Sequence, residues 1–296
     1  MALTPRSPPP TRLPGGGTTD NVYGPMAQSG YGNPFFYHNF ADDFDNQLGA
    51  AGLYTASGTG SVVHTAGDGG LALFSTTASA STFATIQLPA ASMTLPLTGA
   101  TPPGTANSSK KLFYLARLQL SDVTLSAFIA GWCNTTATTF ASGVQNITDG
   151  LFFYKAPGGT ALQVLNIGSA GNSPSGSGYT NTFTIPTSAY SLVAATNIDL
   201  SMSIDGNQNL FMFVGSQLVG YMPQSGFGAT STTGSGVSVL PPLGPALANY
   251  NFQSQGVQTP ILYTTANLNL TLGVSNGTTA AIKTMTADFH CMQKER

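Results

Sequence analysis

The sequence predicts an all-β protein, a two-sheet antiparallel jelly-roll β-sandwich that follows an extended N-terminal arm. From residue 35 onward, short apolar or alternating segments are separated by clusters of Gly, Pro, Asn, Asp, Ser and Thr, which is the pattern of strands and turns. Apolar residues spaced three and four positions apart, as in helices, are almost absent. The chain has 296 residues, and one large sandwich of about 200 to 250 residues is an ordinary single domain.

Residues 1–34 are predicted to form an arm outside the sandwich. They contain seven prolines and three consecutive glycines at 15–17, which disfavour helices and central strands. Tyr23, Met26 and Tyr31 are spaced apolar residues in this segment and are candidate partner-binding residues. Two interpretations stay open: an arm that becomes ordered across a neighbouring subunit, or a tail that has no partner.

Residues 35–296 are predicted to form the sandwich domain. The segment 111–120 is apolar on both faces, which is typical of a central strand. The segment 197–204 alternates Ile, Leu and Met with Asp and Ser, which predicts one solvent-facing side and different neighbours for these two strands. The candidate strands are 35–40, 71–75, 83–88, 111–120, 126–133, 150–155, 161–167, 182–185, 198–204, 209–214, 218–222, 262–274 and 282–292.

The segment 198–222 predicts a meander of three antiparallel strands, because Asp205-Gly206 and Gly215-Ser216 are suited to tight turns. Longer loops rich in Gly, Ser and Pro are predicted at 89–110, 168–181 and 223–259. The last of these is too long for a simple turn, and we interpret it as a contact loop. Its candidate partner-binding residues are Phe227, Tyr250 and Phe252.

The composition indicates a weakly charged surface. Charged residues make up 7% of the chain, so that the polar surface must consist mainly of Ser, Thr, Asn, Gln and Gly. A net charge of −2 predicts no nucleic-acid partner. The chain start lacks the apolar core of a secretory signal, and no run of about 18 apolar residues is present. We therefore expect synthesis in a cytoplasm, no membrane, and a surface suited to contact with other proteins.

The acidic residues predict no catalytic site. The single Glu of the chain, Glu295, lies next to the C-terminal residue, so a carboxylate pair of the glycosidase type is absent. Asp42, Asp43 and Asp45 form either a calcium loop or a solvated turn in which the carboxylates cap backbone N–H groups. Asp149 precedes a glycine and is interpreted as a turn residue. We expect no enzymatic activity and no bound cofactor.

Histidine and cysteine spacing predicts no metal site. His38, His64 and His290 have no second ligand at zinc-type spacing and are interpreted as half-buried strand residues. Cys133 and Cys291 are interpreted as reduced thiols that behave as small hydrophobic residues.

Trp132 is the single tryptophan and ends an apolar run. We expect a core position for it, and the alternative is an exposed ring that stacks on a sugar.

Four elements, taken in chain order, resemble the concanavalin-A-like (laminin-G-like) jelly roll over residues 36–292. They are the aromatic and arginine of 113–117, the pair Gly131-Trp132, the Asp-Gly-aromatic-aromatic run of 149–153, and the Asp205-Gly206 turn before Phe211 and Phe213. The metal cluster of the lectins and the carboxylate motif of the glucanases are absent. The resemblance therefore implies the fold without sugar binding or hydrolysis.

The low charge and the missing catalytic acids are similar to the jelly-roll proteins that tailed bacteriophages carry as capsid decoration or cement proteins. That resemblance implies a structural protein on the outer capsid surface of the virion, with the major capsid protein as partner. It also implies homo-oligomers, trimers more readily than dimers, whose N-terminal arms hold the capsid. The alternative function is a glycan- or receptor-binding module of a phage fibre or spike. A hydrolase is the least favoured class.

Overall fold

The computed structural model describes the parts of the chain that build the sandwich. Described are residues 37–44, 54–65, 70–95, 111–134, 147–172, 178–185, 187, 189–204, 209–222 and 263–295. Within these ranges the secondary structure consists of β-strands and one 3₁₀ turn, Ala170–Asn172. The described chain is therefore all-β, as predicted.

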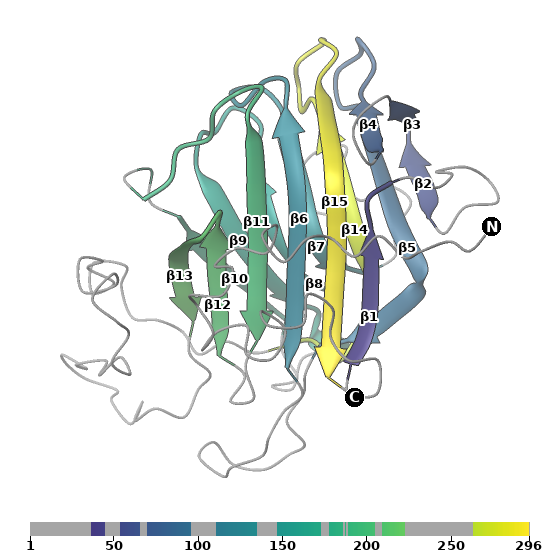
Figure 1. Cartoon of the computed structure of the whole chain (residues 1–296). Coiled ribbons are helices and arrows are strands. Elements are labelled where there is room, and N and C mark those ends of the chain that lie inside the picture. Colours follow the sequence, from purple (N-terminus) through teal and green to yellow (C-terminus); the bar gives the residue numbers. More distant parts are fainter. Residues whose placement is uncertain are drawn as a thin grey trace.

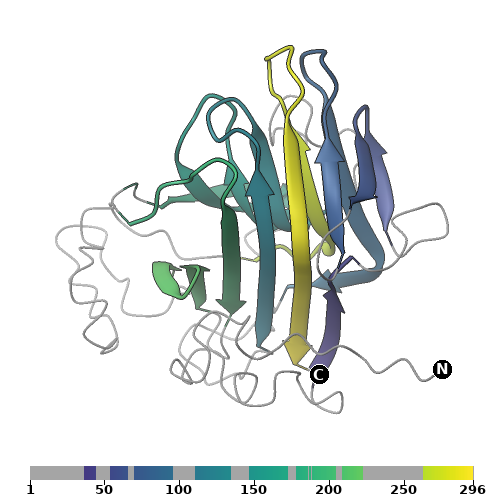
Figure 2. The ribbon, with the colours of Figure 1, turned by 45° about the horizontal axis from the view of Figure 1, so that its top comes forward.

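The strands form two antiparallel sheets that stack face to face (Figures 1 and 2). Sheet A has the order β13 (Gln217–Met222), β12 (Leu210–Val214), β11 (Asn197–Ile204), β6 (Leu112–Leu120), β15 (Thr284–Glu295), β4 (Leu71–Ser75), β3 (Ser61–Thr65), with β1 (Tyr37–Asp42) also paired to β15. Sheet B has the order β10 (Tyr179–Thr184), β9 (Leu162–Gly168), β8 (Gly150–Lys155), β7 (Ala127–Cys133), β14 (Asn267–Ser275), β5 (Phe83–Thr94), β2 (Thr55–Gly58). This is a jelly-roll β-sandwich, and the predicted fold class is confirmed.

Alternate residues of each strand point between the sheets and form the core. In β6 the inward residues include Tyr114 and Leu118, and in β7 they include Phe128 and Trp132, each at most 1% exposed. Trp132 is therefore packed in the core, as expected from the apolar run that it ends. Since both sheets contribute large apolar side chains, burial between them is the main stabilising contribution to the fold.

One prediction about the strands of sheet A was wrong. The strand β11 lies directly beside β6, with Asp199 opposite Arg117, and the second neighbour of each strand differs, β12 for β11 and β15 for β6, as predicted. Ser201 and Ser203, which were expected to face solvent, are buried. The polarity of a serine is a weak predictor of its exposure, because small hydroxyl side chains tolerate burial when they are hydrogen-bonded.

Most predicted strands agree with the observed ones to within a few residues. The strands β2 and β3 were missed because their sequences, TASG and SVVHT, are short and mainly polar. The strand β5 extends to Thr94, within a segment predicted as loop, and β10 likewise begins at Tyr179. The turn at Gly215 is confirmed, with φ of +60°, and the Asp205-Gly206 turn lies outside the described residues.

Several loops meet at one end of the sandwich, at the top of Figure 1. We call this the upper loop end and define it as residues 59–60, 76–82, 121–126, 156–161, 189–196 and 276–283. Backbone hydrogen bonds join the loops to the ends of neighbouring strands here, including Ser121 N to Thr284 O (2.9 Å) at the start of β15 and Ala195 N to Leu120 O (2.8 Å) at the end of β6. The loops 121–126, 189–196 and 276–283 thus lie side by side.

Candidate functional site

The partner-binding residues predicted from the sequence lie outside the described residues. This applies to the arm, residues 1–34, and to the contact loop, residues 223–259. Their candidate residues are Tyr23, Met26, Tyr31, Phe227, Tyr250 and Phe252. They stay predictions, and the candidate site below consists of described residues only.

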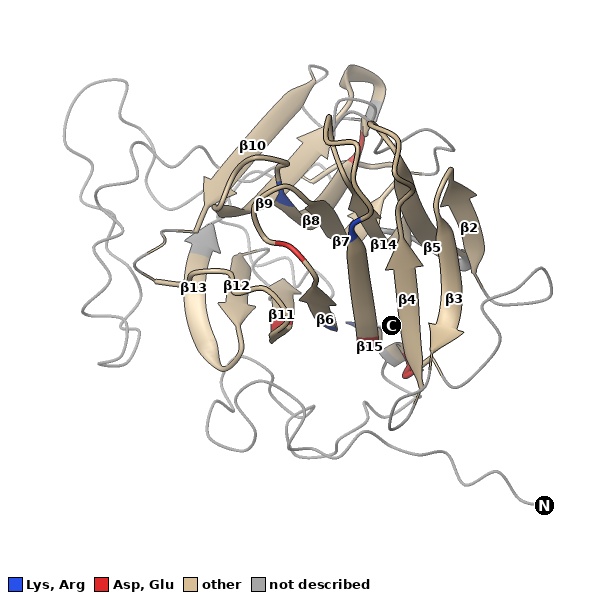
Figure 3. Ribbon diagram, turned by 90° about the horizontal axis from the view of Figure 1, so that it is seen from above, with Lys and Arg blue, Asp and Glu red and all other residues tan. Residues whose placement is uncertain are grey.

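Aliphatic side chains are exposed on three adjoining loops of the upper loop end. Leu125 is 38% exposed, Val193 is 56% exposed and Ile282 is 61% exposed. We call these three residues the upper apolar patch. Figure 3 looks onto this end and shows few charged positions among the loops. An exposed apolar group on a weakly charged surface is typical of a protein contact. The sequence signal was weak, because each loop mixes apolar and polar positions without a regular period.

A buried ammonium braces the loop that carries Leu125. The Lys155 side chain is fully buried, and its Nζ donates to the carbonyl oxygens of Thr124 (3.3 Å), Ser126 (2.5 Å) and Ala156 (3.0 Å). Burial lowers the pKa of Lys155 to about 8. Because three carbonyl oxygens accept from it, the lysine holds the end of β8 against the loop 121–126.

Two further contacts brace the loop that carries Ile282. Lys283 Nζ donates to Asp122 Oδ2, and this hydrogen bond holds the pKa of Asp122 at about 2. The Asn276 amide accepts from Thr82 N (2.9 Å), and it donates to Thr77 O (3.1 Å) in the neighbouring loop and to Ala281 O (3.1 Å) in its own loop. The apolar patch is therefore carried by loops that are fixed before any partner binds.

On the outer face of sheet A, one guanidinium joins two carboxylates. Arg117 Nε lies 2.6 Å from Asp199 Oδ1, and Arg117 Nη2 lies 2.9 Å from Asp199 Oδ2. Asp288 Oδ2 lies 3.6 Å from Arg117 Nη1. The hydrogen bonds from Arg117 to Asp199 raise the pKa of Arg117. Both carboxylates are thus paired with a cation.

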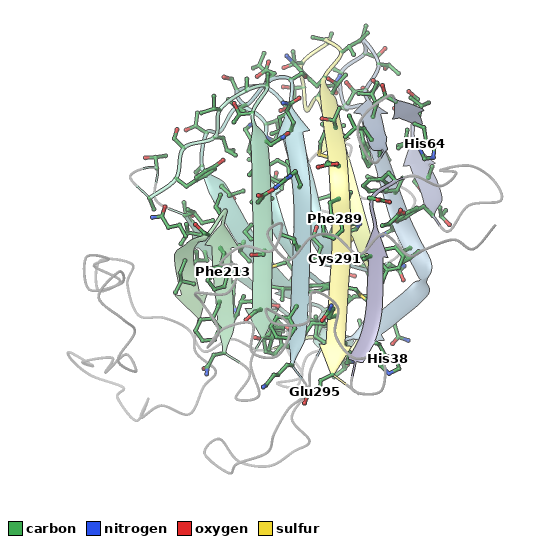
Figure 4. The ribbon with its side chains drawn as sticks, viewed as in Figure 1. His38, His64, Phe213, Phe289, Cys291 and Glu295 are labelled. Carbon is green, nitrogen blue, oxygen red and sulfur yellow. The ribbon has the colours of Figure 1, made fainter. Side chains whose placement is uncertain are left out.

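Beside this ion group, Leu115, Phe289 and Cys291 form an apolar cluster whose members are 5% to 8% exposed. Figure 4 labels Phe289 and Cys291 on β15.

Asp149 was predicted to be a turn residue, and the structure shows in addition that its carboxylate is buried and hydrogen-bonded. It lies in a bend directly before β8 but is only 2% exposed. Asp149 Oδ1 accepts from Thr264 Oγ1 (2.5 Å) and Ser169 N (3.1 Å), and Asp149 Oδ2 accepts from Thr148 Oγ1 (3.0 Å). The carboxylate therefore connects segments next to β8, β9 and β14 as a buried acceptor.

Two other carboxylates also accept from the backbone. Asp42 Oδ1 accepts from Phe44 N (2.9 Å), which confirms the capping that was predicted for this turn, and burial raises the pKa of Asp42. Glu295 Oε2 accepts from Lys111 N (3.0 Å). In the described ranges, no group of three or more His, Cys, Asp or Glu side chains could hold a metal ion. The calcium alternative includes Asp45, which lies outside those ranges.

All three histidines lie on strands, but their burial differs from the prediction. His38 and His64 are exposed on β1 and β3, well apart in Figure 4, whereas His290 is fully buried. Cys133 and Cys291 are free and buried, as predicted. Within the described ranges, no helix has the length and hydropathy that a membrane span requires.

No protein-family model and no curated protein matches the chain. Among solved structures, peanut lectin with a nine-residue peptide is similar (TM-score 0.46, 9% identity, 87% of this chain and 97% of that chain). A GH16 protein of the Bacteroides ovatus mixed linkage glucan PUL has a TM-score of 0.48 at 8% identity, covering 86% of this chain and 99% of that chain. The CBM2 module of the evolved Dit of Lactobacillus casei BL23 phage J-1 has a TM-score of 0.42 at 12% identity, covering 88% and 96%. These similarities concern the jelly-roll architecture and assign no ligand or activity.

Proposed function

We propose that this chain is a non-catalytic structural protein that attaches to a protein shell through the upper apolar patch. Within this class we propose a capsid decoration protein of a tailed bacteriophage, bound to the outer surface of the major capsid protein. The observation that carries the proposal is the exposure of Leu125, Val193 and Ile282 on braced, adjoining loops. Burial of these side chains against a partner gains about 25 cal/mol per Å² of apolar surface.

The bracing contacts favour a contact surface that exists before binding. Lys155, Asn276 and the Asp122–Lys283 pair fix the loops, so attachment requires little further ordering of the backbone. Since ordering of loops and side chains is a main cost of association, a prearranged patch binds more tightly than an equal area of unstructured chain.

Hydrogen bonds and ion pairs of the acidic side chains support a non-catalytic role. Asp149 is buried among donors, Asp199 and Asp288 share Arg117, and Asp122 pairs with Lys283. A general acid or base needs a titratable group that can reach a substrate and exchange a proton. The paired and buried carboxylates are better suited to holding strands and loops together.

The partner and the location are part of the same proposal. The arm at residues 1–34 would extend the contact with the major capsid protein, and self-association into trimers would multiply a weak contact per chain. Binding through several copies increases total affinity without a larger patch on each chain. The protein would be made in the host cytoplasm and found on the assembled virion.

The test is attachment to phage heads. Heads of the phage that encodes the chain, stripped of this protein, are mixed with wild-type protein or with the double variant Val193→Ser/Ile282→Ser and sedimented. We expect the double variant to bind at least tenfold more weakly, which corresponds to about 1.4 kcal/mol. Val63→Ser is the matched control, because Val63 is 48% exposed but lies on β3 outside the patch. A folded double variant that binds like wild type would contradict the proposal.

A glycan- or receptor-binding module is the alternative that the sequence left open. It is distinguished by binding of the isolated wild-type protein to a glycan array and to host cells. Array binding that survives Val193→Ser/Ile282→Ser, together with no attachment to stripped heads, would replace the decoration role by this alternative. Of the Phe, Tyr and Trp side chains that the structure describes, none is exposed.

A further inference from the structure

Three aromatic side chains with polar groups meet inside the sandwich. Tyr114 of β6 and His290 of β15 come from sheet A, and Trp132 of β7 comes from sheet B. The ring centroids of Tyr114 and Trp132 are 5.1 Å apart, and those of Tyr114 and His290 are 5.5 Å apart. All three side chains are at most 1% exposed. This is a polar cluster in the middle of an otherwise apolar core.

Four polar atoms of this cluster are buried without a hydrogen-bond partner in the described part of the protein. They are Tyr114 Oη, Trp132 Nε1, His290 Nδ1 and His290 Nε2. Buried polar atoms in proteins are nearly always paired, either with protein groups or with an internal water molecule. Four unpaired atoms on three neighbouring side chains are therefore available for hydrogen bonds to a small guest molecule.

Small side chains lie next to the cluster on the same inner faces. Ala116 is the register partner of His290 and lies two residues from Tyr114 along β6. Ala130 lies two residues from Trp132 along β7, and both alanines belong to the buried core. Because a methyl group fills little of the space between two sheets, these positions favour room for a small guest beside the polar atoms.

The donor and acceptor properties of the four atoms indicate which small molecule would bind there. The indole N–H only donates, the phenol hydroxyl donates and accepts, and a neutral imidazole has one donor and one acceptor. A metal ion would find one imidazole and no carboxylate among them. An anion would find no charged group among them, since burial lowers the pKa of His290 to about 3 and leaves the imidazole neutral. Water, with two donors and two acceptors, matches this mixed set.

We propose that the core contains an internal water-binding site formed by Tyr114, Trp132 and His290. At least one water molecule accepts a hydrogen bond from the Trp132 indole and bonds to the Tyr114 hydroxyl and the His290 imidazole. This water joins sheet A to sheet B by hydrogen bonds. The site is independent of the upper apolar patch, so it stands whether or not the protein attaches to a capsid.

The direct test uses the single tryptophan of the chain. The full-length protein labelled with ¹⁵N gives one indole N–H resonance, which needs no further assignment. We expect a cross-peak between this proton and the water resonance in both NOESY and ROESY spectra, with signs that report a residence time longer than about 1 ns. An indole proton that persists in solvent and shows no cross-peak to water would overturn the proposal.

A second test separates a bridged hydroxyl from an unpaired one. If Tyr114 Oη bonds to the water, Tyr114→Phe removes a partner and lowers the urea midpoint of unfolding. If the hydroxyl is unpaired, the same change removes a buried orphan group and leaves the midpoint unchanged or raises it, which would contradict the proposal. Tyr190→Phe is the control, because Tyr190 is only partly buried at the edge of the core.

Discussion

Arg117 and Asp199 face each other across β6 and β11 and form a two-point salt bridge on the outer face of sheet A. Asp288 reaches the same guanidinium from β15, on the other side of β6. One side chain therefore links three adjacent strands of the sheet. Because the two partner carboxylates come from distant parts of the sequence, the alternation within each strand gives no indication of this contact.

Asp199→Asn is expected to destabilise the protein by about 1 kcal/mol, because a partly exposed bidentate pair contributes at the upper end of surface ion pairs. Asp288→Asn should cost less, since Asp288 makes one longer contact of 3.6 Å. Urea unfolding of both variants measures the difference. An equal loss in the two variants, or a larger loss in Asp288→Asn, would show that the geometry of the Asp199 pair does not determine its contribution.

Lys155→Met is expected to cost about 2 kcal/mol or more, because the carbonyl oxygens of Thr124, Ser126 and Ala156 lose their shared donor in a buried place. The loop 121–126 should then be cut faster by protease in the native state. Calorimetry and limited proteolysis measure the two effects. The control Lys111→Met should change stability by less than about 0.5 kcal/mol, since the contact between Lys111 and Glu295 uses its backbone N–H.

The free energy of unfolding is expected to depend on pH through His290. Burial lowers the pKa of His290 to about 3, whereas an unfolded histidine titrates near 6.5. Between these values the unfolded chain binds a proton that the native chain does not, so stability falls as pH falls from 6.5 toward 3. The contribution is about 1.4 kcal/mol per pH unit.

Urea unfolding between pH 4 and 7 measures this slope as the difference between wild type and His290→Phe. The difference is needed because burial raises the pKa of Asp42, which acts in the opposite direction in the acid range. A wild-type slope in His290→Phe would show that this histidine is protonated or exposed in the native protein.

Gly131→Ala is expected to destabilise the sandwich severely, whereas Gly215→Ala should cost about 1 kcal/mol. A Cβ on Gly131, where φ is +152°, would lie 2.6 Å from both Leu151 O and Phe152 Cα. At Gly215, where φ is +60°, a Cβ has no neighbour within 4 Å and only the backbone strain remains. Thermal melts followed by far-UV circular dichroism compare the two. Similar melting temperatures would mean that β7 and β8 can separate slightly to accept a methyl group.

The local pattern predicted much of the fold. The strands at 71–75 and 150–155 were predicted with both ends correct, because alternation and flanking turn residues are local properties. The core position of Trp132 and the meander of β11, β12 and β13 followed from the same signals. The strands β2 and β3 carry little apolar sequence, and their strand character comes from pairing with β5 in sheet B and with β4 in sheet A.

Composition and period-two alternation thus sufficed for the all-β class and for most of the strand positions, since these depend on neighbours along the chain. The pairing of Arg117 with Asp199, the burial of Asp149 and Lys155, and the contacts of Tyr114 with Trp132 and His290 depended on tertiary structure. The alternation of apolar and polar residues predicts which side chains share a face of a strand. It does not state which strand lies alongside or what lies above that face, because those contacts join residues far apart in sequence.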